Sequence, residues 1–554
     1  FWLVSGSMRV VVAAALCCVG RSTTPNFVFL LGDDIGWGDV GYNGGTALTP
    51  HLDEWTKVDG TVTFMDGHSG GTVCSPTRAT ILTGRNHFRD CVSYVYDCSD
   101  MTECDPHFPF AQQRTFTVAD AVRAKGAGYT SFFGGKWHLG SLYNDTAFPS
   151  SPLFHGFDSM DATVEVAPTA TANCQCDVLW NEACNFGHYG NVAKHCAGGP
   201  NPGGGSLPDG CCFNYWHRGG SPHGVCNLTA PSEKDDSQHV AKSFHTFLDS
   251  TEGPYLAHLS FHNCHIPFIG QDSSRALCKS GETCRLPKKN STEAQFDFYA
   301  CLNELDASVG AVLKQVRDRG DYGHTMIWFA SDNGPEGNCN PTGFCDDDFF
   351  KQWPGDAGKL RGRKRDVWEG GHRVPTVVSW PNVVKGPARV SWQTVATMDF
   401  FATVMDALQV RRPEDQEDWP VDGLSIVPIL ASDNFAWKRQ MAWAYRTWPL
   451  DARFGYAWRH GDLKVVVGSY SCGSKSETCA PALYDLSLDL NETRDLAAEM
   501  PDVLADMLRN LSLWSASVSH SRQAESLCEE SVSAQNPSNL PDVHIGNPWA
   551  RFDA

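Results

Sequence analysis

The sequence has little positive charge, and beyond its first twenty residues it has no apolar run long enough to cross a membrane. Of its 554 residues, 44 are Lys or Arg and 64 are Asp or Glu, so the formal net charge is −20 at pH 7. An acidic chain repels nucleic acid and anionic lipid, which disfavours both as the main partner. We therefore expect no stable membrane span and no nucleic acid. If the substrate is an anion, the positive charge that binds it must be concentrated at the binding site.

The start of the chain predicts entry into the secretory pathway. Residues 8–20 (MRVVVAAALCCVG) combine one basic residue with a short apolar run, so we predict a signal peptide at 1–20, the residues before Met8 included. A signal anchor is the alternative interpretation. The chain has 22 cysteines, which favour an oxidising compartment. Five glycosylation sequons agree with this, at Asn144, Asn227, Asn290, Asn491 and Asn510. We expect a secreted or lysosomal protein.

Apolar, β-rich runs alternate with helix-like segments. The runs are residues 26–31, 129–135, 255–261 and 325–331. Residues 116–126 and 299–320 have the character of helices. This alternation predicts an α/β fold, with a large, mostly parallel mixed sheet sandwiched by helices. Ligands of such sheets bind outside the carboxyl ends of the strands. The polar residues that follow the four runs are therefore expected to meet in one site.

Two segments depart from this pattern. Residues 171–226 contain seven cysteines and stretches rich in Gly and Pro, but no Cys-x-x-Cys pair. A disulfide-stapled insertion is favoured there over a zinc module. From about residue 440 the sequence predicts a small antiparallel sheet, followed by a closing helix at 501–514. We therefore divide the chain into a main domain at 24–435, which carries the insertion, and a C-terminal subdomain and tail at 436–554.

Carboxylates and one amide follow two of the predicted strands. Asp33 and Asp34 come directly after the first run, and Asp332 and Asn333 follow the last. Oxygen ligands of this kind suit a hard cation, Ca²⁺ before Mg²⁺. Each pair taken alone is more often a turn or a helix cap. Their expected position at one edge of the sheet favours a metal site.

Other candidate residues leave several interpretations open. Lys136 and His138 follow the second run and would share a face if the chain stays extended. His262 and His265 follow the third, where zinc binding is a rival. The basic run KLRGRKR (359–365) is either a solvated face or an anion-binding segment. The cysteine of CSPTRATILTGR (74–85) could be half of a disulfide, a thiol nucleophile, a metal ligand or the precursor of another group.

Six motifs in one order give the chain a resemblance to a known family. They are LLGDDIGWGDVGY, CSPTRATILTGR, GKWHLG, HNCHIPF, ASDNG and LRGRKRDVWEGGHRVP, from residue 30 to 375. WPVDGLSIVPIL and ALYDLSLDLNET extend the similarity to residue 493. The chain resembles a type I sulfatase of the alkaline phosphatase superfamily. The Cys-x-Pro-x-Arg pattern is the most specific of these signals.

The resemblance implies that Cys74 becomes formylglycine, an aldehyde made by a formylglycine-generating enzyme during biosynthesis. A hydrated aldehyde carries two hydroxyls on one carbon. One attacks sulfur and displaces the alcohol, and the other then expels sulfate as the aldehyde re-forms. A serine would offer only the first hydroxyl and would tend to stay sulfated. The substrate implied is a sulfate ester, either an aryl sulfate or a sulfated carbohydrate.

The resemblance also implies roles for the other motif residues. A single divalent cation, usually Ca²⁺, would be held by Asp33, Asp34, Asp332 and Asn333. Arg78 would hold the aldehyde hydrate, and Lys136 and Lys364 would bind the sulfate oxygens. His138 would contact the formylglycine hydroxyl, and His265 would donate a proton to the leaving oxygen.

Two departures from the family pattern and two other functions remain open at this level. Arg363 stands where the family has a glycine before the second lysine, so Arg363 or Arg365 could contribute to anion binding beside Lys364. Cys264 precedes His265 and could be paired or simply buried. The alternatives are a phosphoester hydrolase of the same superfamily and a non-catalytic protein that binds sulfated glycans.

Overall fold

The computed structural model describes residues 24–95, 115–140, 151–163, 216–217, 237–266, 268, 270–286, 291–337, 353–446, 450, 454–468 and 480–524. The predicted signal peptide at 1–20 lies outside these residues, and so does the predicted insertion at 171–226 apart from 216–217. Among the helices of the described residues, none combines the length and the apolar character that crossing a membrane requires.

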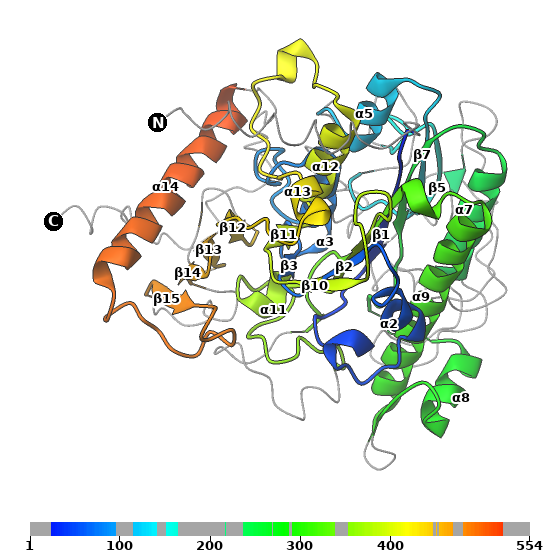
Figure 1. Ribbon diagram of the computed structural model, residues 1–554. Helices are drawn as coiled ribbons and strands as arrows, with labels where there is room; N and C mark the ends of the chain where they lie inside the picture. Colours follow the sequence, from blue (N-terminus) through cyan, green and yellow to red (C-terminus); the bar gives the residue numbers. More distant parts are fainter. Residues whose placement is uncertain are drawn as a thin grey trace, which may run out of the picture.

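A nine-stranded sheet forms the centre of the molecule (Figure 1). Its strands, in spatial order, are β10 (Arg389–Ser391), β2 (Thr61–Phe64), β9 (Thr376–Ser379), β8 (Thr325–Ser331), β1 (Asn26–Gly32), β7 (Tyr255–Ser260), β4 (Thr130–Lys136), β5 (Ser159–Thr163) and β6 (Trp216–His217). The four predicted strands are β1, β4, β7 and β8, and they are parallel neighbours. β9 runs antiparallel to both of its neighbours. The predicted fold class, a mostly parallel mixed sheet between helices, is confirmed.

Helices cover both faces of this sheet. One layer contains α3 (Cys74–Thr83), α5 (Val118–Lys125) and α12 (Asp399–Leu408). The other contains α2 (Pro50–Trp55), α7 (Ser237–Asp249), α9 (Glu293–Asp318) and α8 (Asp272–Ser280). The two predicted helices correspond to α5 and α9. α9 begins before the predicted residue 299 because Thr292 and Gln295 form a capping box at its start.

Short elements complete the main domain. They are β3 (Gly67–His68), which pairs with β11 (Val395–Ala396), the helices α11 (Glu369–His372) and α13 (Val427–Ala431), and the 3₁₀ turns η1 (Gly41–Asn43), η2 (Tyr322–His324) and η3 (Glu414–Gln416).

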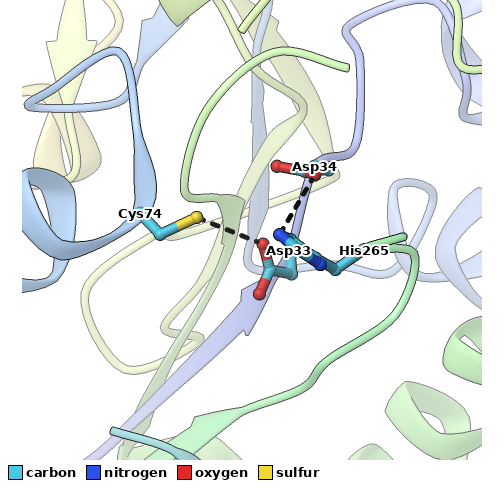
Figure 2. A group of neighbouring side chains, drawn as sticks. All are labelled: Asp33, Asp34, Cys74 and His265. Atoms are coloured by element: carbon cyan, nitrogen blue, oxygen red, sulfur yellow. Dashed lines mark hydrogen bonds and ion pairs between the residues drawn. The ribbon is translucent and has the colours of Figure 1, made fainter. Parts of the chain in front are cut away.

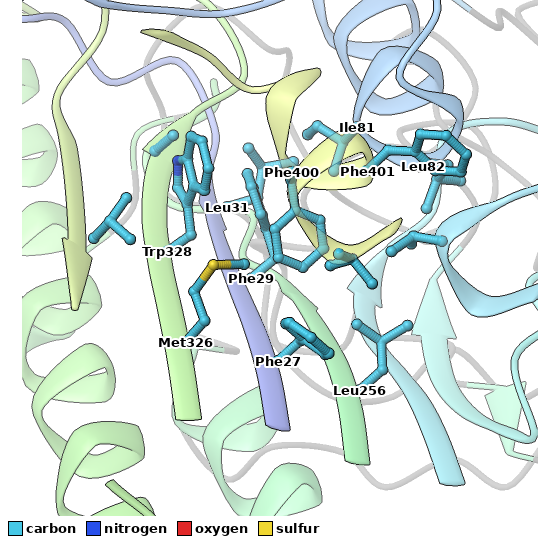
Figure 3. Packing of buried hydrophobic residues seen from close by; sticks show 14 of the residues in the cluster. Phe27, Phe29, Leu31, Ile81, Leu82, Leu256, Met326, Trp328, Phe400 and Phe401 are labelled. Atoms are coloured by element: carbon cyan, nitrogen blue, oxygen red, sulfur yellow. The ribbon is translucent and has the colours of Figure 1, made fainter. Parts of the chain in front are cut away.

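The central strand β1 shows why its sequence is apolar throughout. Phe27, Phe29 and Leu31 pack into one core with residues of α3 and α12 (Figure 3), whereas Val28 and Leu30 pack into the core on the other face. All five side chains are fully buried. Burial of each such side chain stabilises the fold by about 1.5–3 kcal/mol. A strand covered on both faces therefore needs a continuous apolar run, after which the first polar residues mark its carboxyl end.

The C-terminal subdomain is a separate antiparallel sheet with a long helix on one face. Its strands are β12 (Gln440–Ala444), β13 (Tyr456–His460), β14 (Leu463–Val467) and β15 (Ala482–Asp485). α14 (Pro501–Ala524) packs on it through Leu511 and Trp514. The predicted small sheet and closing helix are confirmed, and the helix continues to residue 524 rather than 514. The other face of the sheet packs against the loop of Val367 and Trp368.

A buried network of ion pairs links the C-terminal sheet to the main domain. Lys464 of β14 lies 2.9 Å from carboxylate oxygens of both Glu369 and Glu492. Its ammonium also lies 3.1 Å from Nε2 of His372, whose ring stacks on Trp443 at 3.9 Å. Burial, followed by the charge of Lys464, lowers the pKa of His372 well below its ordinary value, so this histidine is neutral. With an ammonium so close to the ring, the position is an ion-pair network and not a metal site.

Candidate active site

Four oxygen-bearing side chains meet at the carboxyl ends of two adjacent strands. Asp33 and Asp34 follow β1, and Asp332 and Asn333 follow β8, whose register places Ser331 opposite Gly32. The backbone N–H of Asp34 donates to Oδ1 of Asp332 at 3.2 Å, and Nδ2 of Asn333 donates to Oδ1 of Asp34 at 2.6 Å. All four residues are fully buried. The structure therefore brings the four predicted metal ligands together.

The donor atoms of this cluster fit a cation. Burial raises the pKa of Asp34 to about 7, with a contribution from the carboxylate of Asp33, and it also raises the pKa of Asp332. Burial alone would raise the pKa of Asp33 as well, but Lys136 and His265 hold it well below its usual range. Oδ1 of Asn333 is buried and accepts no hydrogen bond. Carboxylates together with an unused amide oxygen fit a hard cation such as Ca²⁺.

Cys74 opens helix α3 beside these carboxylates. Its Sγ lies 3.6 Å from Oδ1 of Asp33 (Figure 2), and it forms no disulfide. Burial, followed by the nearby Asp332 carboxylate, raises the pKa of the thiol well above its ordinary value. The position therefore disfavours a thiolate nucleophile and excludes half of a disulfide.

The Leu-Thr-Gly part of the cysteine motif ends the same helix. Gly84 has a φ of 67°, and a Cβ placed there would lie 2.6 Å from the ring of Phe401. A side chain at this position would be strained by the backbone and would collide with the core. The glycine therefore fixes where α3 stops, and this keeps the helix pressed against α12 with Cys74 at its buried start.

Arg78 lies one turn into α3 and points to the same carboxylates. Its Nη2 donates to Oδ2 of Asp332 at 2.8 Å and to Oδ2 of Asp33 at 3.2 Å. Nη1 donates to the backbone oxygen of Lys136 at 2.7 Å and also to the Ser260 hydroxyl. These bonds hold the guanidinium rigidly between the helix and the strand ends.

Two buried lysines contact different carboxylates of the cluster. Nζ of Lys136, at the end of β4, lies 2.5 Å from Oδ2 of Asp33. Nζ of Lys364 lies 2.7 Å from Oδ1 of Asp34 and 3.0 Å from Oε2 of Glu336. Burial would lower the pKa of each lysine, but Asp33 and Asp34 respectively raise it, so both stay charged. The local positive charge that an anionic substrate requires is present here.

Two of the predicted histidines border the cluster. His265 places Nε2 3.8 Å from Oδ2 of Asp34, whereas its Nδ1 lies 2.7 Å from the backbone oxygen of Ile266. Because a carbonyl only accepts, Nδ1 carries the proton in the neutral ring. His138 is buried, with a φ of 56°, and its backbone oxygen accepts from the hydroxyl of Ser75 at 2.6 Å. Nε2 of His262 lies 2.7 Å from Oγ1 of Thr163.

The departures from the family pattern have structural explanations. Arg363 donates through Nε and Nη2 to the backbone oxygen of Glu336, at 3.0 and 2.6 Å. Arg365 instead pairs with the carboxylate of Glu336, so among these three basic residues it is Lys364 that contacts Asp34. Cys264 is buried, and its Sγ lies 3.8 Å from the backbone oxygen of Phe298.

Sequence reasoning missed Glu336. It is 5% exposed, and its carboxylate holds both Lys364 and Arg365. Its position in the sequence could have revealed it. Glu336 is an acidic residue two places after the ASDNG motif, and the basic run at 359–365 needs an acidic partner where it packs. Neither its partners nor its burial follow from the local sequence.

A mixed sheet between helices, with carboxylates, two lysines and an arginine around a helix-opening cysteine, defines a hydrolase of the alkaline phosphatase superfamily. The family model named Sulfatase matches residues 25–410. The chain therefore belongs to the sulfatase family, and its enzyme class is that of the sulfuric ester hydrolases.

Individual relatives agree with this membership. Arylsulfatase A of Homo sapiens is 26% identical over 538 residues, covering 92% of this chain and 91% of the relative. Arylsulfatase G of Mus musculus is 27% identical, covering 89% and 88%. N-acetylgalactosamine-6-sulfatase of Mus musculus is 26% identical, covering 76% and 69%.

Solved structures with this fold include sulfatases. Ps i-CgsB in complex with k-i-k-neocarrahexaose has a TM-score of 0.67 at 18% identity, covering 89% of this chain and 93% of that one. The PsFucS1 sulfatase from Pseudoalteromonas sp. has a TM-score of 0.64 at 20% identity, covering 92% and 93%. At such identities the likeness concerns the fold alone.

Proposed function

We propose that this protein hydrolyses sulfate esters, R–O–SO₃⁻, to an alcohol and sulfate, with a formylglycine made from Cys74 and one Ca²⁺ ion. The observation that carries the proposal is the surroundings of Cys74. Its side chain is buried at the start of α3, with Asp33 against its sulfur and with Lys136 and Lys364 among the charges that act on its pKa. A thiol has no evident chemical role at this position. A nucleophile that attacks an anion needs the positive charge of the two lysines as well as the negative charge of Asp33.

Calcium fits the donor set better than zinc does. The side chains that would hold it are Asp33, Asp34, Asp332 and Asn333, which offer oxygen only. A zinc site would draw on histidine and cysteine. Cys74 and His265 lie beside Asp33 and Asp34 (Figure 2), but conversion of Cys74 to formylglycine removes the thiol and leaves one histidine beside four oxygen-bearing side chains. Once bound, the cation would polarise the sulfate oxygens and favour an ionised nucleophile.

The chain's own residues then divide the remaining work. Lys136 and Lys364 bind sulfate oxygens and neutralise their charge, because both are charged and each contacts a carboxylate of the cluster. Arg78 orients the side chain at position 74 from one helical turn away, and His138 contacts its hydroxyl. His265 donates a proton from Nε2 to the leaving oxygen, and it must be in its protonated form to do so, because the single proton of the neutral ring lies on Nδ1, which is bonded to a carbonyl. The formylglycine hydrate supplies the nucleophile and, through its second hydroxyl, the release of sulfate.

The proposal includes the biosynthesis and organisation of the protein. Residues 24–435 form the catalytic domain, including the insertion at 171–226, and residues 436–554 form the C-terminal subdomain and tail. A signal peptide at 1–20 directs the chain into the secretory pathway, where the formylglycine-generating enzyme meets it. The mature protein is a secreted or lysosomal glycoprotein.

Mass spectrometry of the peptide that contains Cys74 tests the proposal first. The protein would be secreted from a eukaryotic host that converts a control sulfatase expressed in parallel. We expect the mass of the aldehyde or its hydrate in place of the thiol, together with hydrolysis of an aryl sulfate. The variant Cys74→Ser should lose turnover, because it has only one hydroxyl.

An unmodified thiol at position 74 in that host would refute the mechanism. Assays of an aryl sulfate beside the matching aryl phosphate address the phosphoester alternative. Faster turnover of the phosphate would identify a phosphoester hydrolase. Binding of a sulfated glycan without any turnover would identify a non-catalytic protein.

A further inference from the structure

An exposed arginine near the site has a backbone conformation that is rare for its residue type. Arg446 has a φ of 70°, in the left-handed region that side chains other than glycine seldom adopt. Seven other described residues besides glycine share this property; three of them, Asp34, His138 and Arg365, with φ of 58°, 56° and 82°, belong to the site or its loop, and the other four lie elsewhere. Such strain persists only where the surroundings hold it, and it gathers at functional positions.

Aromatic rings hold the Arg446 side chain in place. Its guanidinium carbon lies 4.9 Å from the ring centre of Tyr94 and 5.8 Å from that of Phe454. Tyr445 contacts both rings, at centroid distances of 5.7 and 6.3 Å. The guanidinium is thereby fixed by cation–π contacts while the residue remains exposed.

Hydrogen bonds connect this part of the chain to the active-site loop. The backbone N–H of Arg365 donates to the oxygen of Thr72 at 2.9 Å, two residues before Cys74. Nε1 of Trp443, two residues before Tyr445, donates to the backbone oxygen of Ser69 at 3.0 Å, in the same segment that leads into Cys74. Arg365 and the strand end that carries Tyr445 and Arg446 therefore both border the segment that leads into Cys74, and Arg446 is exposed. We refer to Arg365, Arg446, Tyr94, Tyr445 and Phe454 as the arginine–aromatic rim.

The two arginines of the rim differ in whether a carboxylate pairs with them. The carboxylate of Glu336 neutralises Arg365. Within the described part of the chain, Arg446 forms no ion pair with any carboxylate. An exposed guanidinium, oriented by rings and left without an anion, offers a planar fork of donors that matches a sulfate or a carboxylate.

We propose that the rim binds a second anionic group of the substrate, so that the preferred substrate is a saccharide carrying a sulfate or carboxylate besides the sulfate that is hydrolysed. This inference rests on the proposed function, because it adds a second anion-binding region beside the same catalytic site. Arg446 contacts the second anion, and the rings of Tyr94 and Phe454 offer flat apolar faces to a sugar ring. A simple aryl sulfate has no second anion and gains nothing from Arg446.

Four substrates and three variants test the proposal. The substrates are an aryl sulfate, a monosaccharide with one sulfate, the same monosaccharide with a second sulfate, and the monosulfated sugar joined to a uronic acid. Arg446→Gln removes the charge and Arg446→Lys keeps it without the fork. Arg411→Gln is the matched control, since Arg411 is 81% exposed and its nearest acidic partner, Glu417, lies 3.7 Å away on the surface.

The measured quantity is the ratio of kcat/KM for a two-anion substrate to kcat/KM for the single-sulfate sugar. We expect Arg446→Gln to lower this ratio about tenfold, through KM rather than kcat, since an exposed charged hydrogen bond is worth roughly that much. Arg446→Lys should retain part of the preference, and Arg411→Gln should leave the ratio unchanged. The second sulfate and the uronic acid, compared in the wild type, decide which anion the rim takes.

The outcomes separate this proposal from the one on which it rests. A wild-type protein that cleaves none of the four substrates overturns both. A protein that cleaves sulfate esters with the same ratio in wild type and Arg446→Gln overturns only the rim. An equal loss on all substrates also overturns it, because that result indicates a structural role for Arg446.

Discussion

Replacing Glu336 with glutamine should weaken both the fold and the turnover, because one buried carboxylate holds two cations of the loop that carries Lys364. Oε2 lies 3.0 Å from Nζ of Lys364, and the same carboxylate pairs with Arg365. Removing one partner of a buried ion pair costs about 3–5 kcal/mol. In this variant Lys364 keeps its ion pair with Asp34 at 2.7 Å, and the Arg365 side chain is 21% exposed. We therefore expect the free energy of unfolding to fall by an amount at the lower end of this range, about 3 kcal/mol.

The effect on turnover follows from the position of the ammonium. Without Glu336, Lys364 is held by Asp34 alone, and the glutamine would aim an N–H donor at one of two cations. A displacement approaching 1 Å at a group that binds the reacting anion costs up to about 100-fold. We therefore expect kcat/KM for an aryl sulfate to fall by on the order of 10- to 100-fold.

The assay combines steady-state kinetics with unfolding in urea for three variants. Glu336→Asp keeps the charge and should recover part of both losses. Glu499→Gln is the matched control, because Glu499 pairs with Arg494 at 2.8 Å on the surface, with side chains 57% and 67% exposed. That change should alter the free energy of unfolding by less than about 0.5 kcal/mol and leave kcat/KM intact. If Glu336→Gln kept wild-type kinetics and stability, the carboxylate of Glu336 would not be positioning Lys364 or Arg365.

Three further changes have expected outcomes. Lys464→Met should cost about 3–5 kcal/mol in urea unfolding, because Glu369 and Glu492 lose the ammonium 2.9 Å from each; an unchanged midpoint would contradict this. Burial lowers the pKa of His258 to about 3, so the unfolded chain, with a histidine pKa of about 6.5, binds this proton first as the pH falls. Stability is therefore lost below pH of about 6.5, by about 2 kcal/mol at pH 5 for this residue, and His258→Phe should show a correspondingly smaller loss between pH 7 and 5. Dialysis against EDTA should abolish hydrolysis and lower the unfolding temperature, with Ca²⁺ restoring both better than Mg²⁺; full activity in protein shown to be metal-free would refute a metal site.

The carboxylate cluster could be predicted from the sequence because it depends on a local rule. In a strand covered on both faces, polarity begins where the strand ends, and parallel neighbours end at the same edge. The positions of Asp33 and Asp332 follow from this reasoning once the apolar runs before them are recognised as parallel strands. The cysteine motif was interpreted through its resemblance to a family pattern, and the structure then showed that a helix begins at Cys74 and ends before Gly84.

The contacts made by loops could not be predicted in the same way. The direction of Lys364, Arg363 and Arg365 is decided by Glu336, a residue from another loop, and no periodicity relates the two segments. Arg446 illustrates the same limit, since its partner Tyr94 comes from the other end of the chain. An acidic or basic side chain in a loop has the same local sequence whether it faces solvent or a buried partner.

The sequence by itself determined the layered α/β fold, the edge of the sheet where the chemistry lies and the residues that follow its strands. Those features depend on hydrophobic periodicity and on short motifs, which act over a few residues. Only the tertiary structure decided which cation meets which carboxylate, that Glu336 belongs to the site, and that aromatic rings hold the exposed Arg446. These depend on burial and on distances between segments far apart in the chain, and both exist only once the chain has folded.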